Sequence, residues 1–429
     1  MTIKKMTIPY GNSMIEFEIP ASKLVFDGAL CDIPRVKDFE DTLRTRLSNP
    51  IGCPPLSDQL NKGDKVLILI EDATRNTPVK SILPILVEHL ESSGIQAKDI
   101  EILTAPGTHR VMTAQEIIDK VGQDIVQKLV INQHDYQDES SMIYMDSVEV
   151  EGFKIPVQIN KKVQEFDFII GLGNIIPHSD AGFSGGAKIM QPGICGYATT
   201  AATHIAAALL DEIPLGNVEN PCRLGMEKVA RQAGLKFIIN TVMNYKGEII
   251  DIVTGDFVDA HRHGANISKK AYSVYMSQLA DIVIVSSHPA DIDFWQALKG
   301  VTAAYFAVKK GGYIIFASPC YEGLEHNHPQ FKEWLKLTYD QIVKKSKNAP
   351  MDDRSIDLIS ADLAVCNSRV REKANVLVVT HGLTQKELDI LQYTPYLSVQ
   401  DAIDFAIGMI PDATIGLLPR GGDSLPILL

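Results

Sequence analysis

The run Lys65-Val-Leu-Ile-Leu-Ile-Glu-Asp72 decides the fold, because its unbroken apolar centre is typical of a strand buried on both faces of a sheet. The same kind of pattern recurs along the first half of the chain. Further strands are predicted at 99–107 and 128–133, and another buried strand at 167–173. Helices are predicted between them, at 78–94 and from Thr113, where Thr113-x-x-Glu116 forms a capping box. Strands that alternate with helices predict a parallel sheet.

The rest of the chain extends this pattern. The N-terminal segment alternates like a strand pair, hairpins are predicted at 148–160 and 235–255, and 257–280 is predicted to be helical. Strands then return at 280–288, 311–319, 374–382 and 412–419. We therefore expect an α/β protein of two domains, 1–270 and 271–429. Each domain is a mostly parallel sheet with helices on both faces, and the active site lies in the cleft between the domains.

Length and charge narrow the functional classes. A chain of 429 residues is long for one core, so two domains are the default expectation. The formal net charge of -12 argues against nucleic acid as a partner, because phosphate binding needs a basic surface. No apolar stretch is long enough for a membrane span, and the N-terminal segment lacks the apolar core of a signal peptide. The six cysteines form no CxxC pattern. We expect a cytoplasmic protein with reduced thiols.

Five polar clusters follow predicted strands, where parallel sheets bind their ligands. They are 72–78, 106–110, 177–188, the segment around His204, and 293–300. Each cluster has a plainer explanation. Asp72 can cap a helix, Arg75 can pair with it at the surface, and a histidine at a strand end can be a hydrogen-bonded loop residue. The shared position of all five clusters favours a site.

The stretch His178-Ser-Asp-Ala-Gly-Phe-Ser-Gly-Gly-Ala-Lys188 places a lysine behind two glycines. It is no P-loop, since Ala187 precedes Lys188 and no hydroxyl residue follows it, and 171–176 lacks the third glycine of a dinucleotide fingerprint. Three explanations stay open. The loop can cradle a phosphate, with Gly193 opening a helix. Lys188 can form a Schiff base, or it can anchor a cofactor.

Taken together, the clusters resemble the nickel-pincer-nucleotide-dependent 2-hydroxy acid racemases and epimerases, the lactate racemase-like family. The matching motifs are DATR (72–75), GTHR (107–110), PHSDAGFSGGAK (177–188), His204 and WQALK (295–299). Their order and approximate spacing match over nearly the whole chain. Each motif alone is weak, and the combination is specific.

The resemblance implies a cofactor and a set of roles. The cofactor is the nickel-pincer nucleotide (pyridinium-3-thioamide-5-thiocarboxylic acid mononucleotide nickel), joined covalently to Lys188. His204 would be the nickel ligand. The remaining implied cofactor-binding residues are Asp72, Arg75, Ser184, Gly185 and Gly186. The implied catalytic residues are the acid/base pair His109 and His178, with Arg75, Gln296 and Lys299 orienting the substrate.

The resemblance also implies an activity. The protein would be an isomerase that inverts C2 of a small 2-hydroxy acid by reversible hydride transfer, and cofactor-biosynthesis proteins would be transient partners. Lactate, malate, longer or aromatic hydroxy acids and sugar acids all stay open as substrates, and Trp295 departs from the tyrosine associated with lactate-specific members. The alternative is a non-catalytic relative that binds a hydroxy acid or the cofactor.

Overall fold

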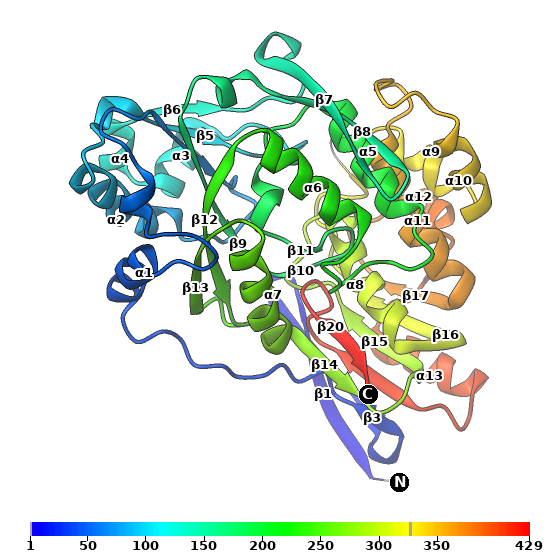
Figure 1. The fold of residues 1–429 in the computed structure, drawn as a ribbon. Helices are drawn as coiled ribbons and strands as arrows, with labels where there is room; N and C mark the ends of the chain where they lie inside the picture. Colours follow the sequence, from blue (N-terminus) through cyan, green and yellow to red (C-terminus); the bar gives the residue numbers. More distant parts are fainter. Residues whose placement is uncertain (1, 326–327) are drawn as a thin grey trace.

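The first half of the chain is built around the apolar run that begins at Lys65. The computed structural model describes residues 2–325 and 328–429 (Figure 1). Strand β4 (Val66–Ile70), buried at every residue, lies inside a six-stranded sheet with the order β13-β12-β9-β4-β5-β6. The other strands are β5 (Ile100–Thr104), β6 (Val130–Gln133), β9 (Phe168–Asn174), β12 (Leu235–Met243) and β13 (Ile249–Gly255). All neighbours pair in parallel except β13, which returns antiparallel to β12.

Helices cover both faces of this first sheet. On one face, α2 (Val79–Ser92) buries Ile82, Leu83 and Leu86 in a core that also contains residues of α1 (Phe39–Ser48). On the other face, the core includes apolar residues of α6 (Pro221–Gln232) and α7 (Asp259–Tyr272). A strand buried on both faces needs this double cover, which is why β4 has no polar residue.

The second sheet is parallel throughout and has the order β18-β17-β16-β15-β19-β3. Its strands are β3 (Leu24–Phe26), β15 (Ala280–Ser286), β16 (Val308–Ala317), β17 (Asn375–Val379), β18 (Thr394–Pro395) and β19 (Ile415–Leu418). One face carries α8 (Phe294–Ala307) and α11 (Leu358–Lys373). The other carries α13 (Val399–Met409) and the hairpin of β1 (Ile3–Tyr10) and β2 (Ser13–Pro20). The expected two-domain α/β fold with mostly parallel sheets is confirmed.

The N-terminus departs from the predicted division at 270. β3 pairs with β19, and the hairpin β1–β2 packs on the second sheet through Ile8, Phe17 and Ile19. The N-terminal segment therefore lies with 271–429 and not with the rest of 1–270. The sequence of β3, three apolar residues, does not indicate a partner strand almost 400 positions away, because pairing between distant strands leaves no pattern in the local sequence.

Two local predictions are also corrected. The helix predicted over 257–280 ends at Tyr272, and β14 (Ser273–Met276) follows, because it finds a parallel partner in β20 (Leu425–Leu428). Gly193 opens no helix, since α5 begins only at Tyr197. A Cβ atom at Gly193 would lie 2.0 Å from the carbonyl oxygen of Ile189, so the glycine permits a close backbone approach.

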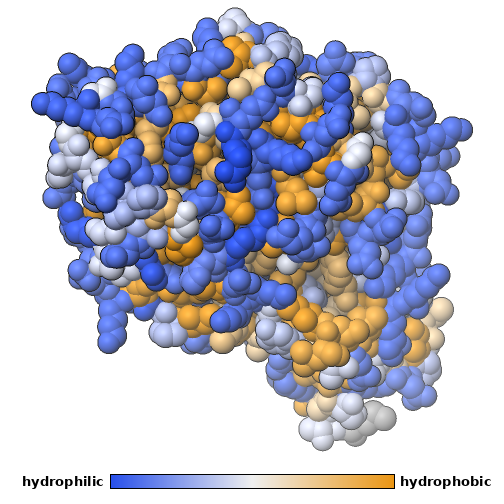
Figure 2. All heavy atoms as spheres, viewed as in Figure 1, coloured by the Kyte–Doolittle hydropathy of each residue, from blue (hydrophilic) through white to orange (hydrophobic). Residues whose placement is uncertain are grey.

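The surface is mostly polar on the face shown in Figure 2, with apolar side chains gathered towards its lower end. The large exposed side chains of β14 (Ser273–Met276) and β20 (Leu425–Leu428) include Tyr275 and Leu428. No helix within residues 2–325 and 328–429 has both the length and the apolar character needed to cross a membrane.

Candidate active site

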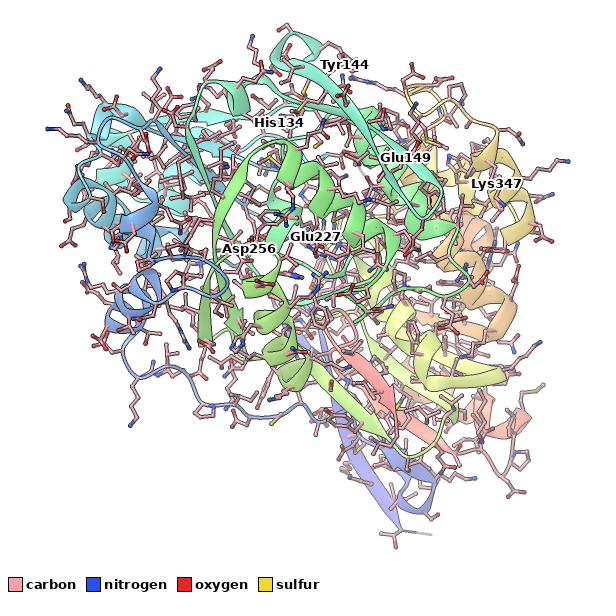
Figure 3. All side chains as sticks on the ribbon, viewed as in Figure 1. His134, Tyr144, Glu149, Glu227, Asp256 and Lys347 are labelled. Atoms are coloured by element: carbon pink, nitrogen blue, oxygen red, sulfur yellow. The ribbon has the colours of Figure 1, made fainter. Side chains whose placement is uncertain are left out.

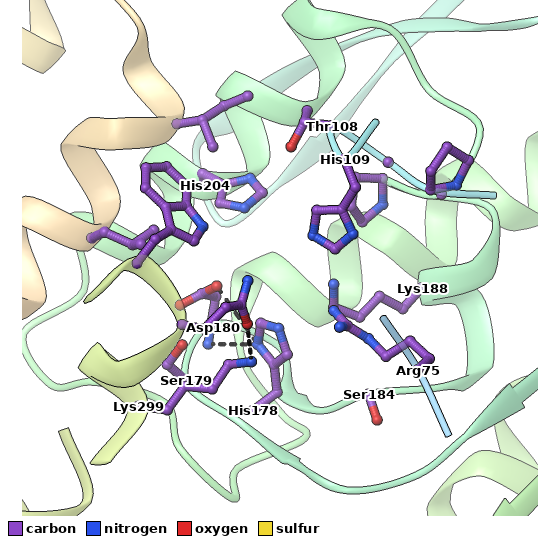
Figure 4. Close-up of a pocket in the computed structure, with 18 of the residues that line it drawn as sticks. Arg75, Thr108, His109, His178, Ser179, Asp180, Ser184, Lys188, His204 and Lys299 are labelled. Atoms are coloured by element: carbon purple, nitrogen blue, oxygen red, sulfur yellow. Dashed lines mark hydrogen bonds and ion pairs between the residues drawn. The ribbon is translucent and has the colours of Figure 1, made fainter. Parts of the chain in front are cut away.

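A cavity of about 140 Å³ lies between the two halves of the molecule (Figure 4). Its walls come from loops after β4, β5 and β9, from α5, and from α8 and α11 of the second half. The predicted site residues that line it are Asp72, Arg75, His109, His178, Ser184, Lys188, His204, Gln296 and Lys299. The fold thus brings together side chains that are more than 200 residues apart. That this cavity is the active site stays a prediction.

Asp72 and His109 form a pair between the loops that follow β4 and β5. Nδ1 of His109 lies 2.7 Å from Oδ2 of Asp72, and Oδ1 of Asp72 accepts hydrogen bonds from the backbone N–H and the hydroxyl of Thr74. Burial alone would raise the pKa of Asp72, but the His109 hydrogen bond and the positive charge of Arg75 outweigh it. The net result is a pKa well below the usual value, so Asp72 is an ionised anchor for the imidazole.

Arg75 points its guanidinium towards the cavity from the same loop (Figure 4). Its backbone carbonyl accepts a 2.7 Å hydrogen bond from Nζ of Lys120, which fixes the loop. Within the described part of the chain the guanidinium bonds only to Thr74 and makes no ion pair. An arginine without an acidic partner at a cavity wall is available to a bound carboxylate or phosphate.

His178 comes from a tight hairpin, in which β10 (Pro177–His178) pairs with β11 (Gly182–Phe183). The backbone N–H of Asp180 donates to Nδ1 of His178 over 3.2 Å. Burial, together with the positive charges of Lys188 and Lys299, holds the pKa of His178 well below its usual value. This imidazole is therefore neutral, with Nδ1 as the acceptor.

A buried arginine holds the glycine loop in place. The guanidinium of Arg223, on α6, donates to the carbonyl oxygens of Ala181, Phe183 and Gly185, and the side chain is fully buried. Burial lowers the pKa of Arg223 to about 10, so it stays charged. His261 adds a 2.9 Å hydrogen bond to the carbonyl oxygen of Ser184. Sequence reasoning missed both residues, since a helix interior carries no signal for a distant loop.

The two predicted cofactor-binding glycines do not line the cavity. Gly185 and Gly186 have φ of 73° and 60°, conformations that favour glycine. A Cβ atom at Gly186 would lie 2.8 Å from the ring of His261, and one at Gly185 would lie 2.8 Å from Oδ1 of Asn240. These glycines face the protein interior, and their role is to let the loop turn before Lys188.

Lys188 extends into the cavity from the short helix η6 (Gly186–Ile189) that follows the turn. Burial and the nearby charge of Arg75 lower the pKa of Lys188 to about 8. Its amine makes no hydrogen bond or ion pair with any residue that the structure describes. A deeply placed lysine with a lowered pKa and no partner is a reactive amine.

The second half contributes Gln296 and Lys299 from the first turns of α8, where Asp293 caps the helix by accepting from the Gln296 N–H over 2.8 Å. Nζ of Lys299 donates to Oε1 of Gln296 over 2.7 Å. Burial, then the charges of Arg75 and Lys188, lower the pKa of Lys299 to about 7. These two residues lie three apart on the helix, and both line the cavity.

His204 is the one residue of α5 (Tyr197–Ala208) that is not fully buried. Its Nδ1 lies 2.8 Å from the carbonyl oxygen of Thr200 and must donate a hydrogen there, which leaves the lone pair on Nε2. This tautomer is the one that metal-binding histidines adopt when a backbone carbonyl orients them.

One histidine at a strand end has the plainer explanation, a hydrogen-bonded residue without a role in a site. His134, labelled in Figure 3, is completely buried after β6. It bonds to the carbonyl oxygen of Cys195 over 3.0 Å and to the amide of Asn160. Burial lowers its pKa to about 4, so the ring is neutral and both nitrogens are satisfied. His134 is a packing residue, in contrast to His109 and His178.

Comparisons with known proteins agree with this geometry. Residues 10–213 match the lactate racemase N-terminal domain, and residues 275–423 match the lactate racemase C-terminal domain. A lactate racemase from Lactiplantibacillus plantarum is 36% identical over 288 residues, which are 66% of this chain and 67% of that protein. The chain belongs to the lactate racemase family.

Other members of the lactate racemase family extend the match to the full length. A lactate racemase from Thermoanaerobacterium thermosaccharolyticum is 29% identical over 423 residues, 96% of this chain and 97% of that protein. The structure of the lactate racemase apoprotein from the same organism superposes with a TM-score of 0.87 at 28% identity, covering 99% of this chain and all of that one. A crystal structure of a Thermotoga maritima protein, 21% identical with a TM-score of 0.67 over 91% of this chain and 98% of that one, shares the fold. Membership confirms the expectation of an enzyme of the isomerase class.

Three acidic residues in or beside the cavity were not predicted. Glu71 and Asp180 line the cavity, and Asp362 of α11 lies beside Asp180. Burial raises the pKa of Glu71, whose carboxyl group accepts a hydrogen bond from Thr77. Asp180 lies within the motif 177–188, and Glu71 directly precedes the cluster 72–78, so an ionisable residue at a strand end was the available signal. Asp362 had none, because its helix lies beyond every motif.

Proposed function

We propose that this protein is a 2-hydroxy acid racemase or epimerase that works with a nickel-pincer nucleotide attached to Lys188. The observation that carries the proposal is the convergence of two histidines and two cations on one cavity. His109 and His178 approach it from different sides, and Arg75 and Lys299 come from opposite halves of the molecule (Figure 4). Membership in the lactate racemase family supports it independently.

The residues present fit the proposed cofactor. Lys188 offers an unpaired amine with a pKa of about 8 for covalent attachment, and His204 offers Nε2 as a nickel ligand, with Nδ1 held by Thr200. A soft sulfur-bound nickel ion accepts an imidazole nitrogen readily. When bound, the cofactor would supply an acceptor for the hydride of the substrate. Intact-mass analysis and nickel content test these two assignments.

Two cationic side chains, Arg75 and Lys299, would bind the substrate. Arg75 and Lys299 would offset the carboxylate of a 2-hydroxy acid, and an arginine fork suits the two carboxylate oxygens. The amide of Gln296 is already oriented by Lys299 and can bond to a substrate oxygen. These groups touch only atoms that all 2-hydroxy acids share, so they orient the substrate without selecting its side chain.

His109 and His178 would transfer the protons. Because Asp72 accepts the Nδ1 hydrogen of His109, the Nε2 lone pair of that ring can take the hydroxyl proton. Ionised Asp72 then stabilises the imidazolium that forms. His178 is neutral as well, and it would take up a proton in the tautomer that leaves the Nε2 lone pair free. Two bases on different sides would serve the two enantiomers, which explains why one cavity contains both.

Chiral analysis tests the function. The protein, loaded by co-expression with the cofactor-synthesis proteins, is incubated with single enantiomers of lactate, malate, aromatic hydroxy acids and sugar acids. Lactate belongs in the set because the relatives are named for it. Inversion at C2 of at least one acid is expected. A loaded protein that inverts none would instead be a binding protein. His109→Ala and His178→Ala should each lower the rate by about 10²–10⁴-fold while retaining the cofactor.

A further inference from the structure

Two carboxyl groups that the proposed reaction does not use lie beside His204. They belong to Asp180, in the β10–β11 turn of the first half, and Asp362, on α11 of the second half. One ligand atom from each of Asp180, His204 and Asp362 lies within 4.8 Å of the other two. The three residues come from three separate elements, so the tertiary fold alone brings them together.

Asp362 is the unexplained member of this group. The residue is only 2% exposed, and its buried Oδ2 has no hydrogen-bond partner among the described residues. The carboxyl group of Asp180 lies within 4.8 Å of the Asp362 ligand atom. A buried, unsatisfied carboxyl oxygen beside a second acid needs a positive partner.

No side chain supplies that partner. Asp362 makes no ion pair within the described residues, and the nearest guanidinium, that of Arg369, donates to the carbonyl oxygens of Leu210 and Asp211 and to the Tyr339 hydroxyl. Asp180 comes within 3.6 Å of the neutral ring of His178, and its charge also raises the pKa values of Lys188 and Lys299 without an ion pair to either. Within the described residues the cluster therefore has two acidic groups, neither of them ion-paired with a lysine or an arginine, and one free imidazole nitrogen.

We propose that Asp180, His204 and Asp362 form a binding site for a divalent first-row transition-metal ion in the protein without cofactor. An imidazole nitrogen with two carboxylates suits such ions, whereas magnesium and calcium favour oxygen ligands alone. Metal–ligand bonds of about 2.1 Å place three ligands of a trigonal or tetrahedral site about 3.4–3.6 Å apart. The ligand atoms of the cluster lie within 4.8 Å of one another, so they need to approach by up to about 1.4 Å.

Cys366 is the remaining potential metal ligand beside the cluster, and it does not compete for the ion. Burial and the charge of Asp362 raise the pKa of the Cys366 thiol well above its usual value, so Cys366 is protonated and a poor ligand. The hydrogen bond from His204 to Thr200 meanwhile holds the imidazole in the ligating tautomer. The proposed site takes residues from both halves of the molecule, so a bound ion would link Asp180 of the first half to Asp362 of the second.

The test uses protein made without the cofactor-synthesis proteins, and it does not depend on the proposed function. Chelator-treated protein is titrated with Zn²⁺, Co²⁺ and Mg²⁺. We expect one Zn²⁺ or Co²⁺ per chain to survive gel filtration, visible absorption from bound Co²⁺, and no retained Mg²⁺. Asp180→Asn, Asp362→Asn and His204→Ala should each weaken Zn²⁺ affinity by about 10-fold or more.

Asp291→Asn is the matched control. It breaks another His–Asp pair, His288–Asp291, outside the cavity, and should leave the Zn²⁺ affinity unchanged. Thermal unfolding checks that each variant is folded, and Zn²⁺ should raise the melting temperature of the wild type and the control alone. Absence of a retained ion in the wild type would overturn the proposal. So would wild-type affinity in both aspartate variants, because the ion would then be bound elsewhere.

Discussion

Asp72 and His109 stand 37 residues apart in sequence and meet at 2.7 Å between Oδ2 and Nδ1. The carboxylate is buried, whereas the imidazole is partly exposed to the cavity. This pairing fixes which ring nitrogen carries the hydrogen, and so which one faces a substrate.

Asp72→Asn should lower kcat by about 10²-fold or more, because the amide can stabilise the wrong tautomer and cannot stabilise the imidazolium. Racemisation of the substrate found in the chiral screen is the measurement. The variant should retain the cofactor mass. Asp291→Asn breaks a comparable pair outside the cavity and should have wild-type kcat. Equal kcat values for Asp72→Asn and Asp291→Asn would show that the His109–Asp72 pair has no part in the reaction.

The pKa of Lys299, about 7, predicts how substrate binding depends on pH. Below pH 7 the side chain is mostly a charged ammonium that attracts the substrate carboxylate. As the pH rises through the pKa, the free protein loses this charge, so KM should rise on the alkaline side. Lys299→Arg stays charged at every accessible pH and should abolish that rise, even if its KM is higher throughout.

KM measured across neutral and alkaline pH checks this prediction. Lys309→Arg is the control, since Lys309 pairs with Asp281 outside the cavity, and its profile should follow the wild type. An alkaline rise in KM that persists in Lys299→Arg would assign the titration to another group.

Lys188 should be the single attachment point of the cofactor. Both Lys188→Ala and Lys188→Arg should lack the cofactor adduct in the intact mass, because neither offers a nucleophilic amine. Lys299→Met removes the other deep lysine and should still load. An adduct of wild-type mass on Lys188→Arg would contradict the assignment, whatever the activity of the variant.

Arg223→Met should destabilise the fold. The substitution leaves the carbonyl oxygens of Ala181, Phe183 and Gly185 buried without a donor, at a cost of about 3 kcal/mol or more in the free energy of unfolding. Arg231→Met, on an exposed position of the same helix, removes only a cation–π contact with Phe257 and should cost about 0.5–1 kcal/mol. Urea unfolding of the cofactor-free proteins measures both. Similar midpoints would mean that the loop is held by other contacts.

The sequence by itself determined the class of fold and most of the chemistry. Apolar runs such as 66–70 and 168–172 are buried on both faces because nothing else suits the centre of a parallel sheet, so their pattern is local and readable. The strand ends then fix where ligands bind, which is why the order of strands and helices along the chain was enough to group Arg75, His109, His178 and Lys188.

Only the tertiary structure decided the rest, because it depends on contacts between distant segments. β3 joins the second sheet through β19, Arg223 reaches back to the glycine loop, and Asp362 meets Asp180 across the two halves. Gly185 and Gly186 proved to face His261 and Asn240 and not the cavity. A sequence states which side chains are available, but burial and pairing, which set their pKa values and partners, arise only when the chain is packed.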